Sequence, residues 1–461
     1  MGRGWLVAVG VLGLAGLVAP MPAGAQAIGP DVIVGDLHET TRWGAGANGT
    51  IQAYSVGTVS CNIGDTPLQW NGTTNQHPVI GQNLFRLKDG RFEQVGQSWL
   101  KWAYVSLNQS FCGTCQNPGT GYLLGVNCSD PYSATLNGSQ GRLGPKSVVN
   151  PFTGYFPTNH AHPGSGTIDG RLQVHTADVD PAQNAGARYF IEGQYVAPDD
   201  SASGNYRNNA SYRQVWVNPA TFSLSFSNPQ GGGSSTVRMD PAILAWKVQD
   251  PGVSLTSIDV PSDGELIIGV RATSLGAAGW RYELAIQNLN SDRSVGGVFV
   301  PLPPGTNVAN VGFHDVDYHS GEPYDGTDWP GQVVAGGVQW QTAAYGVDPN
   351  ANALRWGTLY NFRFDASVGP QFVREVELTL FQPGTPAALT AALDQGRYLL
   401  GDLNCDGAVD FDDISPFVLA LSDPAGHATA YPGCPISNGD VNGDLAVDFD
   451  DINPFVALLA G

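Results

Sequence analysis

Charged side chains, and basic ones above all, are scarce in this chain. They make up 13% of its 461 residues, about half the share that is usual in globular proteins. The 21 Lys and Arg residues are outnumbered by 41 Asp and Glu residues, which gives a net charge of −20. Because proteins bind the phosphates of nucleic acids through basic patches, this balance predicts no nucleic-acid partner.

The chain also lacks a long apolar run beyond its first residues. Arg3 precedes the apolar stretch 5–19, and small residues follow within 23–27. This order is typical of a cleaved secretory signal peptide, and we assign residues 1–27 to one. Since no later stretch reaches the ~20 apolar residues of a membrane span, we expect no transmembrane segment in the mature chain and a secreted or cell-surface location.

Cysteine is rare, with six residues, and in an exported protein an even number favours disulfides. Cys405 and Cys434 both lie in the C-terminal tail, and we predict that they pair. The other four permit three connectivities, and the CxxC spacing among them keeps zinc or redox chemistry as an alternative. These four are Cys61, Cys112, Cys115 and Cys128.

Glycine and proline are abundant, with 60 and 32 residues, which favours short strands joined by turns. In several segments apolar and polar residues alternate, as they do in half-buried antiparallel strands. The sequence therefore predicts a mainly β body. The alternating segments are 172–174, 222–227, 280–287, 360–365 and 376–380.

We predict one or two β-sandwich-like domains followed by a small α-helical module. The small, flexible residues Gly231–Ser235 mark a boundary, which divides the body into 28–230 and 236–385, with the module at 402–461. A single large β domain with an internal Gly-rich loop is the alternative, because all-β domains can run this long.

Acidic residues are concentrated in the tail, where 402–461 holds eleven Asp and no Lys, Arg or Glu. Oxygen-bearing side chains occupy positions 1, 3, 5, 9 and 12 of Asp402–Asp413, with Gly407 at position 6 and a backbone carbonyl offered at position 7. Calcium takes six to eight hard oxygens, and this spacing is that of a loop wrapped around one ion. The predicted ligands are Asp402, Asn404, Asp406, Ala408, Asp410 and Asp413.

The whole unit repeats at Asp440–Asp451, so we expect two calcium ions. Leu445 replaces glycine at position 6, which predicts a weaker second site because a Cβ is unfavourable in a left-handed backbone. After each loop, apolar residues recur at helical spacing and predict one helix face. The second ligand set is Asp440, Asn442, Asp444, Ala446, Asp448 and Asp451. The two helix faces are Ile414, Phe417, Val418 and Leu421, and Ile452, Phe455, Val456 and Leu459.

A duplicated Asp-x-Asn-x-Asp loop with a single following helix resembles the type I dockerins. In that family two calcium-loaded helices pack antiparallel and bind a cohesin, often within polysaccharide-degrading complexes, so the resemblance implies a cohesin-like partner. It covers 402–461 only, and the Pro- and Gly-rich segment 423–439, which contains Cys434, differs from a compact dockerin linker. The residues matching the partner-recognition positions of dockerins are Phe411, Asp412, Phe449 and Asp450.

One candidate for catalytic or metal chemistry lies within 314–319. On a strand, two carboxylates and a histidine would share one face, where they can bind a metal or exchange protons. These residues are Asp315, Asp317 and His319. Solvated side chains at a strand end are the alternative interpretation. His160 and His162 with His175 form a second metal candidate, although their Pro- and Gly-rich context favours a loop.

The stretches 288–293, 313–319 and 353–364 are similar to uncharacterised secreted proteins of planctomycete-type bacteria, which also end in dockerin-like repeats. That resemblance implies no activity. We favour a non-catalytic protein whose β domains bind either glycans or surfaces. A polysaccharide is then the expected partner. The alternative is an extracellular glycoside hydrolase, acting on O-glycosyl bonds and delivered by its dockerin. Serine esterases and zinc proteases are disfavoured, because neither a Gly-x-Ser-x-Gly nor a His-Glu-x-x-His motif occurs.

Overall fold

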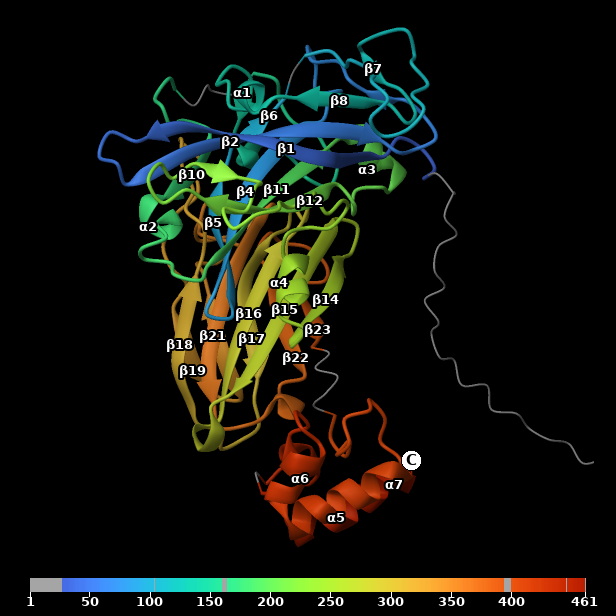
Figure 1. Ribbon diagram of the computed structural model, residues 1–461, viewed down its shortest axis with the longest axis vertical. Coiled ribbons are helices and arrows are strands. Elements are labelled where there is room, and N and C mark those ends of the chain that lie inside the picture. The colour runs from blue at the N-terminus through green and yellow to red at the C-terminus, as the bar shows by residue number, and fades with distance from the viewer. Residues whose placement is uncertain (1–26, 103, 160–163, 394–398, 445, 461) are drawn as a thin grey trace, which may run out of the picture.

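The computed structural model describes residues 27–102, 104–159, 164–393, 399–444 and 446–460. The fold is mainly β, as predicted, with several antiparallel sheets and small helices near the C-terminus. In Figure 1 the sheets fill the upper and middle part of the view, and the C-terminal helices lie at its lower end. The predicted signal peptide lies outside the described residues except for Ala27.

A large antiparallel sheet builds the N-terminal region. Its strands are β1 (Val32–Ala45), β2 (Ile51–Asn62), β4 (Val79–Lys88), β5 (Arg91–Gln97), β6 (Leu100–Lys101), β8 (Ser129–Tyr132), β9 (Leu143–Gly144), β10 (Leu172–His175), β11 (Arg188–Val196), β12 (Ala210–Val217) and β13 (Leu224–Ser225). The main path through the sheet is β1-β2-β10-β5-β4-β11-β12-β13. A two-stranded sheet, β3 (Leu68–Gln69) with β7 (Leu123–Leu124), lies beside it. The short helices of this region are α1 (Ala134–Asn137), η1 (Lys146–Val148), α2 (Thr176–Val179), α3 (Pro198–Ser203) and α4 (Leu244–Gln249).

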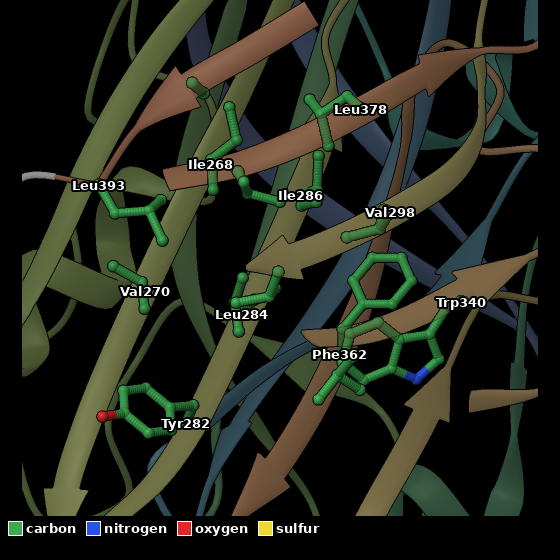
Figure 2. Packing of buried hydrophobic residues seen from close by; sticks show 14 of the residues in the cluster. Ile268, Val270, Tyr282, Leu284, Ile286, Val298, Trp340, Phe362, Leu378 and Leu393 are labelled. Carbon is green, nitrogen blue, oxygen red and sulfur yellow. The ribbon is translucent and has the colours of Figure 1, made fainter. Parts of the chain in front are cut away.

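Two five-stranded antiparallel sheets follow and share one core. The first contains, in order, β14 (Val253–Val260), β15 (Gly264–Ser274), β16 (Trp280–Asn288), β21 (Thr358–Ala366) and β18 (Val308–His314). The second contains β19 (Gly331–Val334), β20 (Gly337–Gln341), β17 (Val295–Pro301), β22 (Glu375–Leu380) and β23 (Ala388–Ala392). The 3₁₀ turns are η2 (Gly276–Ala278) and η3 (Pro370–Phe372). Figure 2 shows Leu284 and Phe362 of the first sheet near Val298 and Trp340 of the second.

Four of the five alternating segments are strands, as predicted, and lie in β10, β16, β21 and β22. The polar face expected to meet water is buried along most of β16 and β21. In β22 buried and exposed residues alternate strictly, because only one face of the strand lies on the core. The segment 222–227 differs, since only Leu224 and Ser225 form a strand. Phe222 has a left-handed backbone with φ of 56°, and its N–H donates to the carbonyl of Asn218 in a turn.

The segment Gly231–Ser235, at which we placed a domain boundary, turns back onto the large sheet. Gly231 and Gly232 have φ of 109° and 82°, which glycine adopts without strain. The N–H of Ser234 donates to the carbonyl of Phe226 at 3.0 Å, and Arg213 of β12 donates to Ser234. The described segment is therefore held by hydrogen bonds.

All six cysteines are paired. Cys61 of β2 bonds Cys112, and Cys115 bonds Cys128, so both disulfides brace the long loop before β8. The zinc and redox alternatives for the CxxC spacing are wrong, because the two cysteines of that motif bond different partners. The tail contains the third disulfide, Cys405–Cys434, which is the pair named from the sequence.

The C-terminal helices pack through stacked phenylalanines. The elements are η5 (Phe411–Asp413), α5 (Ile414–Ser422), α6 (Pro424–Ala430), η6 (Ile436–Gly439), η7 (Phe449–Asp451) and α7 (Ile452–Ala460). The rings of Phe417 and Phe455 lie 4.1 Å apart between centroids, over a small core with Leu403 and Ala420. No helix among the described residues has the length and apolar character that a membrane crossing needs.

The large sheet and the two-sheet sandwich meet at a buried contact. Apolar residues from both sides form one cluster, which includes Phe85, Phe92, Phe190, Trp246, Ile267 and Leu359. Arg91 of β5 donates two hydrogen bonds to Glu283 of β16, at 3.0 and 2.9 Å. The N–H of Leu359 donates to Gln94 Oε1 at 2.7 Å. Apolar burial and directed polar bonds thus join the two regions.

Lys146 is enclosed at this contact. Its Nζ donates to Asn83 Oδ1 and Gln97 Oε1 in the large sheet at 3.1 Å each, and to the carbonyl of Gly357 before β21 at 3.0 Å. Burial lowers the pKa of Lys146 to about 8, partly offset by Glu322 and Glu192. The ammonium has three protons and three acceptors, so its burial is compensated by hydrogen bonds.

We predict that Lys146→Met lowers the free energy of unfolding of the whole chain by at least about 2 kcal/mol, because each buried acceptor left unpaired costs about 1–3 kcal/mol. Urea unfolding followed by fluorescence measures this change. Lys247→Met, at an exposed position of α4, is the matched control and should change stability little. Equal stability of the two variants would contradict the role given to Lys146.

Candidate functional site

The first acidic loop is closed by hydrogen bonds from its own backbone to its carboxylates. Asp413 Oδ1 accepts from the N–H groups of Leu403 and Asn404 at 2.8 and 3.1 Å, and its Oδ2 accepts from Asp410 at 3.0 Å. The N–H of Gly407 donates to Asp402 Oδ2 at 3.0 Å. The two ends of the loop are thereby drawn together around a concave, oxygen-lined turn.

The second loop repeats this pattern. Asp451 Oδ1 accepts from Val441 and Asn442 at 2.7 and 3.0 Å, and its Oδ2 accepts from Asp448 at 3.0 Å. The first aspartate differs, because Asp440 Oδ1 accepts from Gly443 at position 4, at 2.9 Å, whereas Asp402 accepts from Gly407 at position 6. The two loops differ in sequence only at positions 2, 4 and 6, and the last aspartate of each closes its loop through the same hydrogen bonds.

Each loop leads directly into a helix through a capping box. Asp410 accepts from the N–H of Asp412 while Asp413 accepts from the N–H of Asp410, and Asp448 and Asp451 repeat the arrangement. Carboxylates at a helix N-terminus are favourable because unpaired N–H groups and the helix dipole attract negative charge. The last predicted ligand of each loop thus also fixes where its helix begins.

One buried carboxylate oxygen tests whether a cation fits the first loop. Asp402 is fully buried, yet its Oδ1 accepts no hydrogen bond from the described residues. Burial raises the pKa of Asp402, and the nearby charges of Asp413 and Asp406 raise it further. A divalent cation would compensate the buried charge, so the residues present fit calcium.

The remaining predicted donors are amide, carboxylate and backbone oxygens. Asn404 Oδ1 and Asp406 Oδ1 accept from N–H groups two residues further along the loop, at 2.8 and 2.9 Å. Across the described residues, no group of three or more His, Cys, Asp or Glu side chains has a geometry ready for a metal. The donor chemistry, with Asn and backbone oxygens among the carboxylates, is that of hard cations.

Position 4 distinguishes the two loops in a way that the sequence prediction missed. In both loops this residue has a left-handed backbone, with φ of 57° at Cys405 and 80° at Gly443. A residue with a Cβ costs roughly 1–2 kcal/mol in this region, so position 4 favours the second loop. Gly407, at position 6, has φ of 92° and favours the first; Leu445 lies outside the described residues. The backbone cost at position 4 therefore falls on the first loop, whereas the residue at position 6 favours the first loop.

The helix faces predicted after the loops are only partly buried. Phe417 and Phe455 lie in the core, but Ile414 and Val418 are 40% and 56% exposed, and Ile452 and Val456 are 38% and 56% exposed. Only part of each predicted apolar face is therefore buried, because each helix covers little besides the other helix and the loops. The predicted recognition residues are also on the surface, with Phe411 and Phe449 75% and 77% exposed.

The candidate cluster in the body is not on a strand, so that prediction was wrong. Strand β18 ends at His314, and residues 315–319 have no regular structure. The segment instead bonds to the large sheet: Gln97 Nε2 donates to the carbonyl of Asp317 at 2.8 Å, and Trp99 Nε1 to that of His319 at 3.3 Å. These contacts take the place of the strand on which the three side chains would have shared a face.

The three predicted side chains have separate partners. Asp315 accepts from Asn352, and Asp317 Oδ2 lies 2.5 Å from His175 Nε2. His319 bonds through Nε2 to the carbonyl of Gln97 at 2.7 Å and through Nδ1 to Ser320 Oγ at 2.8 Å. Burial lowers the pKa of His319 to about 4, so the ring is neutral at pH 7.

Nevertheless, these residues line one cleft of about 320 Å³ between the large sheet and the sandwich. His175, Asp178 and His314 line it as well, of which the sequence had indicated only His175 as a candidate. Asp178 also accepts from Arg86 at 2.8 Å. His160 and His162 lie outside the described residues. Sequence spacing gave no signal for the Asp317–His175 pair, because its members are 142 residues apart.

Comparison of the chain with protein-family models and with curated proteins found no match. The two candidate sites therefore rest on their own geometry, which is that of two acidic loops at the C-terminus and of a cleft that gathers carboxylates and histidines in the body.

We predict that Asp315→Asn raises the melting temperature at pH 7.5 by about 2–4 °C and leaves it unchanged at pH 4. Burial raises the pKa of Asp315 from 3.8 to about 6. A raised pKa favours folding below pH 3.8, and this advantage is lost as the pH rises through 6. Asparagine stays neutral at both pH values and still accepts from Asn352.

Thermal melting at the two pH values measures the effect. Asp89→Asn, at an exposed turn with a left-handed backbone that asparagine tolerates, is the control. Destabilisation by Asp315→Asn at pH 7.5 would mean that the charged form of Asp315 is favoured by the fold.

Proposed function

We propose that residues 402–461 are a paired calcium-binding docking module, carried by a secreted protein whose β regions bind glycans or surfaces. The observation that carries this proposal is that Asp413 and Asp451 accept the same hydrogen bonds in the two acidic loops, together with the buried, unpartnered Asp402 Oδ1. Calcium bound there would supply the positive charge that the loops lack. Three disulfides are compatible with an oxidising, extracellular location.

The ligands would be the same positions in each repeat. In the first loop they are Asp402, Asn404, Asp406, the carbonyl of Ala408, Asp410 and Asp413. In the second they are Asp440, Asn442, Asp444, the carbonyl of Ala446, Asp448 and Asp451. Asp413 and Asp451 support the proposal most directly, because each holds the start of its loop and the start of its helix in register.

The exposed apolar residues of the module support docking. Phe411, Ile414 and Val418 recur at spacings of three and four, so they lie along one side of η5 and α5. Their equivalents after the second loop have nearly the same exposure. Such residues favour a protein partner, since soluble proteins seldom expose a large apolar surface without a use. Asp412 and Asp450 would give that partner acidic groups to recognise, which is compatible with a cohesin-like protein.

We predict that calcium raises the melting temperature of the C-terminal module and that EDTA reverses the rise. A ligand that binds only the folded state at about 100 times its Kd stabilises by about 2.7 kcal/mol. Differential scanning calorimetry of the whole chain measures the transition. The double variant Asp413→Ala with Asp451→Ala should lose the response, whereas Asp89→Asn should keep it. A module transition that is the same in calcium and EDTA would rule out the calcium proposal.

The cleft between the β regions favours a second function, glycoside hydrolysis. Asp315, with its pKa raised to about 6, would be the general acid, and Asp317, beside His175, the second carboxylate. Glycosidases use such a pair, one protonated and one ionised. Burial raises the pKa of Asp315, which is the direction that a general acid requires.

If the second function holds, the whole chain releases reducing sugar from at least one polysaccharide of a plant and algal panel. Asp317→Asn should then reduce the rate by at least about 100-fold, the usual effect of losing a positioned acid or base, and Asp89→Asn should not. Release that persists in Asp317→Asn would place the chemistry elsewhere, and no release from any substrate would leave glycan or surface binding as the function of the body.

A further inference from the structure

A further groove lies away from both candidate sites. It encloses about 700 Å³ at the end of β11 and β12, beside the C-terminal end of α4. Volumes of this size are typical of ligand sites. Its polar and aromatic lining includes Arg188, Gln214, Trp216, Asn228, Gln230 and Gln249.

Trp216 is unusual among the tryptophans of the described chain because its ring is partly exposed and has no partner there. Most of the others are buried in the cores. Trp43, which is also partly exposed, carries the guanidinium of Arg171 at 3.7 Å and bonds to Ser55, and Trp280 packs against the sandwich core. For Trp216, neither a ring contact nor a side-chain hydrogen bond is found among the described residues. The Trp216 side chain thus lines the groove without a ring contact or a side-chain hydrogen bond to any described residue.

The amides beside Trp216 are also available to a ligand. Gln214 is two residues before Trp216 on β12, so the two side chains project from the same face of the strand. Within the described residues, the side-chain amides of Gln214 and Gln230 make no hydrogen bond. Each can offer two N–H donors and a carbonyl acceptor. The groove therefore combines the ring of Trp216 with amide donors and acceptors that can hydrogen-bond to a ligand.

The lining excludes other classes of ligand. It contains no carboxylate and no histidine, so it does not suit a metal ion or acid–base catalysis. Its one cation, Arg188, is bonded to Gln249, and the chain as a whole carries −20, which disfavours polyanions. Hydroxyl groups match amide donors and acceptors, and the apolar faces of sugar rings match an indole.

We propose that this groove binds a neutral polysaccharide, with Trp216 as the stacking surface and Gln214 and Gln230 as hydrogen-bonding groups. The inference rests on the glycan-binding part of the proposed function and names the site that performs it. Binding here is separate from the calcium loops and from the cleft that contains Asp317, because no residue lines both the groove and either of those sites.

Affinity electrophoresis of the whole chain tests the proposal, with native gels that contain a soluble β-glucan, a galactomannan or a xylan. We expect at least one of these neutral polysaccharides to retard the chain, and a polygalacturonate gel to retard it less. Trp216→Ala should weaken the retarding interaction about tenfold or more, as loss of a central aromatic anchor does. Gln230→Ala, at an exposed loop position, should weaken it without affecting the fold.

Tyr122→Ala removes an aromatic residue that is 55% exposed outside the groove, and it should leave retardation unchanged. Trp216→Phe should restore part of the binding, which a merely unfolded Trp216→Ala variant would not explain. Retardation must also persist in EDTA, so that failure of the calcium module is distinguished from failure of the groove. The proposal is overturned if no neutral polysaccharide retards the chain, or if Trp216→Ala and Gln230→Ala are retarded as strongly as the unaltered chain, in which case glycans bind elsewhere on it.

Discussion

The enclosed ammonium of Lys146 is the interaction on which the arrangement of the two β regions depends. Its acceptors come from both sides of their contact, and a buried charge with fewer partners would cost several kcal/mol. The same contact brings the segment after β18 against β5 and β10. The Asp317–His175 pair and the cleft around it are therefore consequences of how the large sheet and the sandwich meet.

Repulsion among carboxylates imposes a second constraint, at the C-terminus. The small core around Phe417 and Phe455 cannot by itself offset the charge of two acidic loops. Backbone N–H groups offset part of it, because each loop directs several of them at its carboxylates. The disulfide Cys405–Cys434 fixes the first loop to the segment after α6. A cation would offset the charge that remains on Asp402.

The sequence was most informative where one local pattern fixes one conformation. Alternation predicted β16, β21 and β22 because one face of each strand packs in the sandwich core and the opposite face carries mostly polar side chains. It was misleading at 222–227, where turn hydrogen bonds replaced most of the expected strand. At 315–319 the strand considered for the candidate cluster is absent, because that segment bonds to the large sheet instead. Helical spacing placed Ile414 and Val418 on the apolar face of a helix, but both are exposed, because spacing does not show whether a neighbour is present to cover that face.

By itself the sequence determined the mainly β fold, the two repeated acidic loops with their helices, and the pairing of Cys405 with Cys434. These follow from interactions between residues that are close in sequence or that repeat. Only the tertiary structure decided the other two disulfides, the Asp317–His175 pair and the groove around Trp216. The Asp317–His175 pair and the groove bring separate segments together through the packing of whole sheets, which no local pattern encodes. Cys115 and Cys128 are only 13 residues apart, but four cysteines permit three connectivities and no local pattern chooses among them.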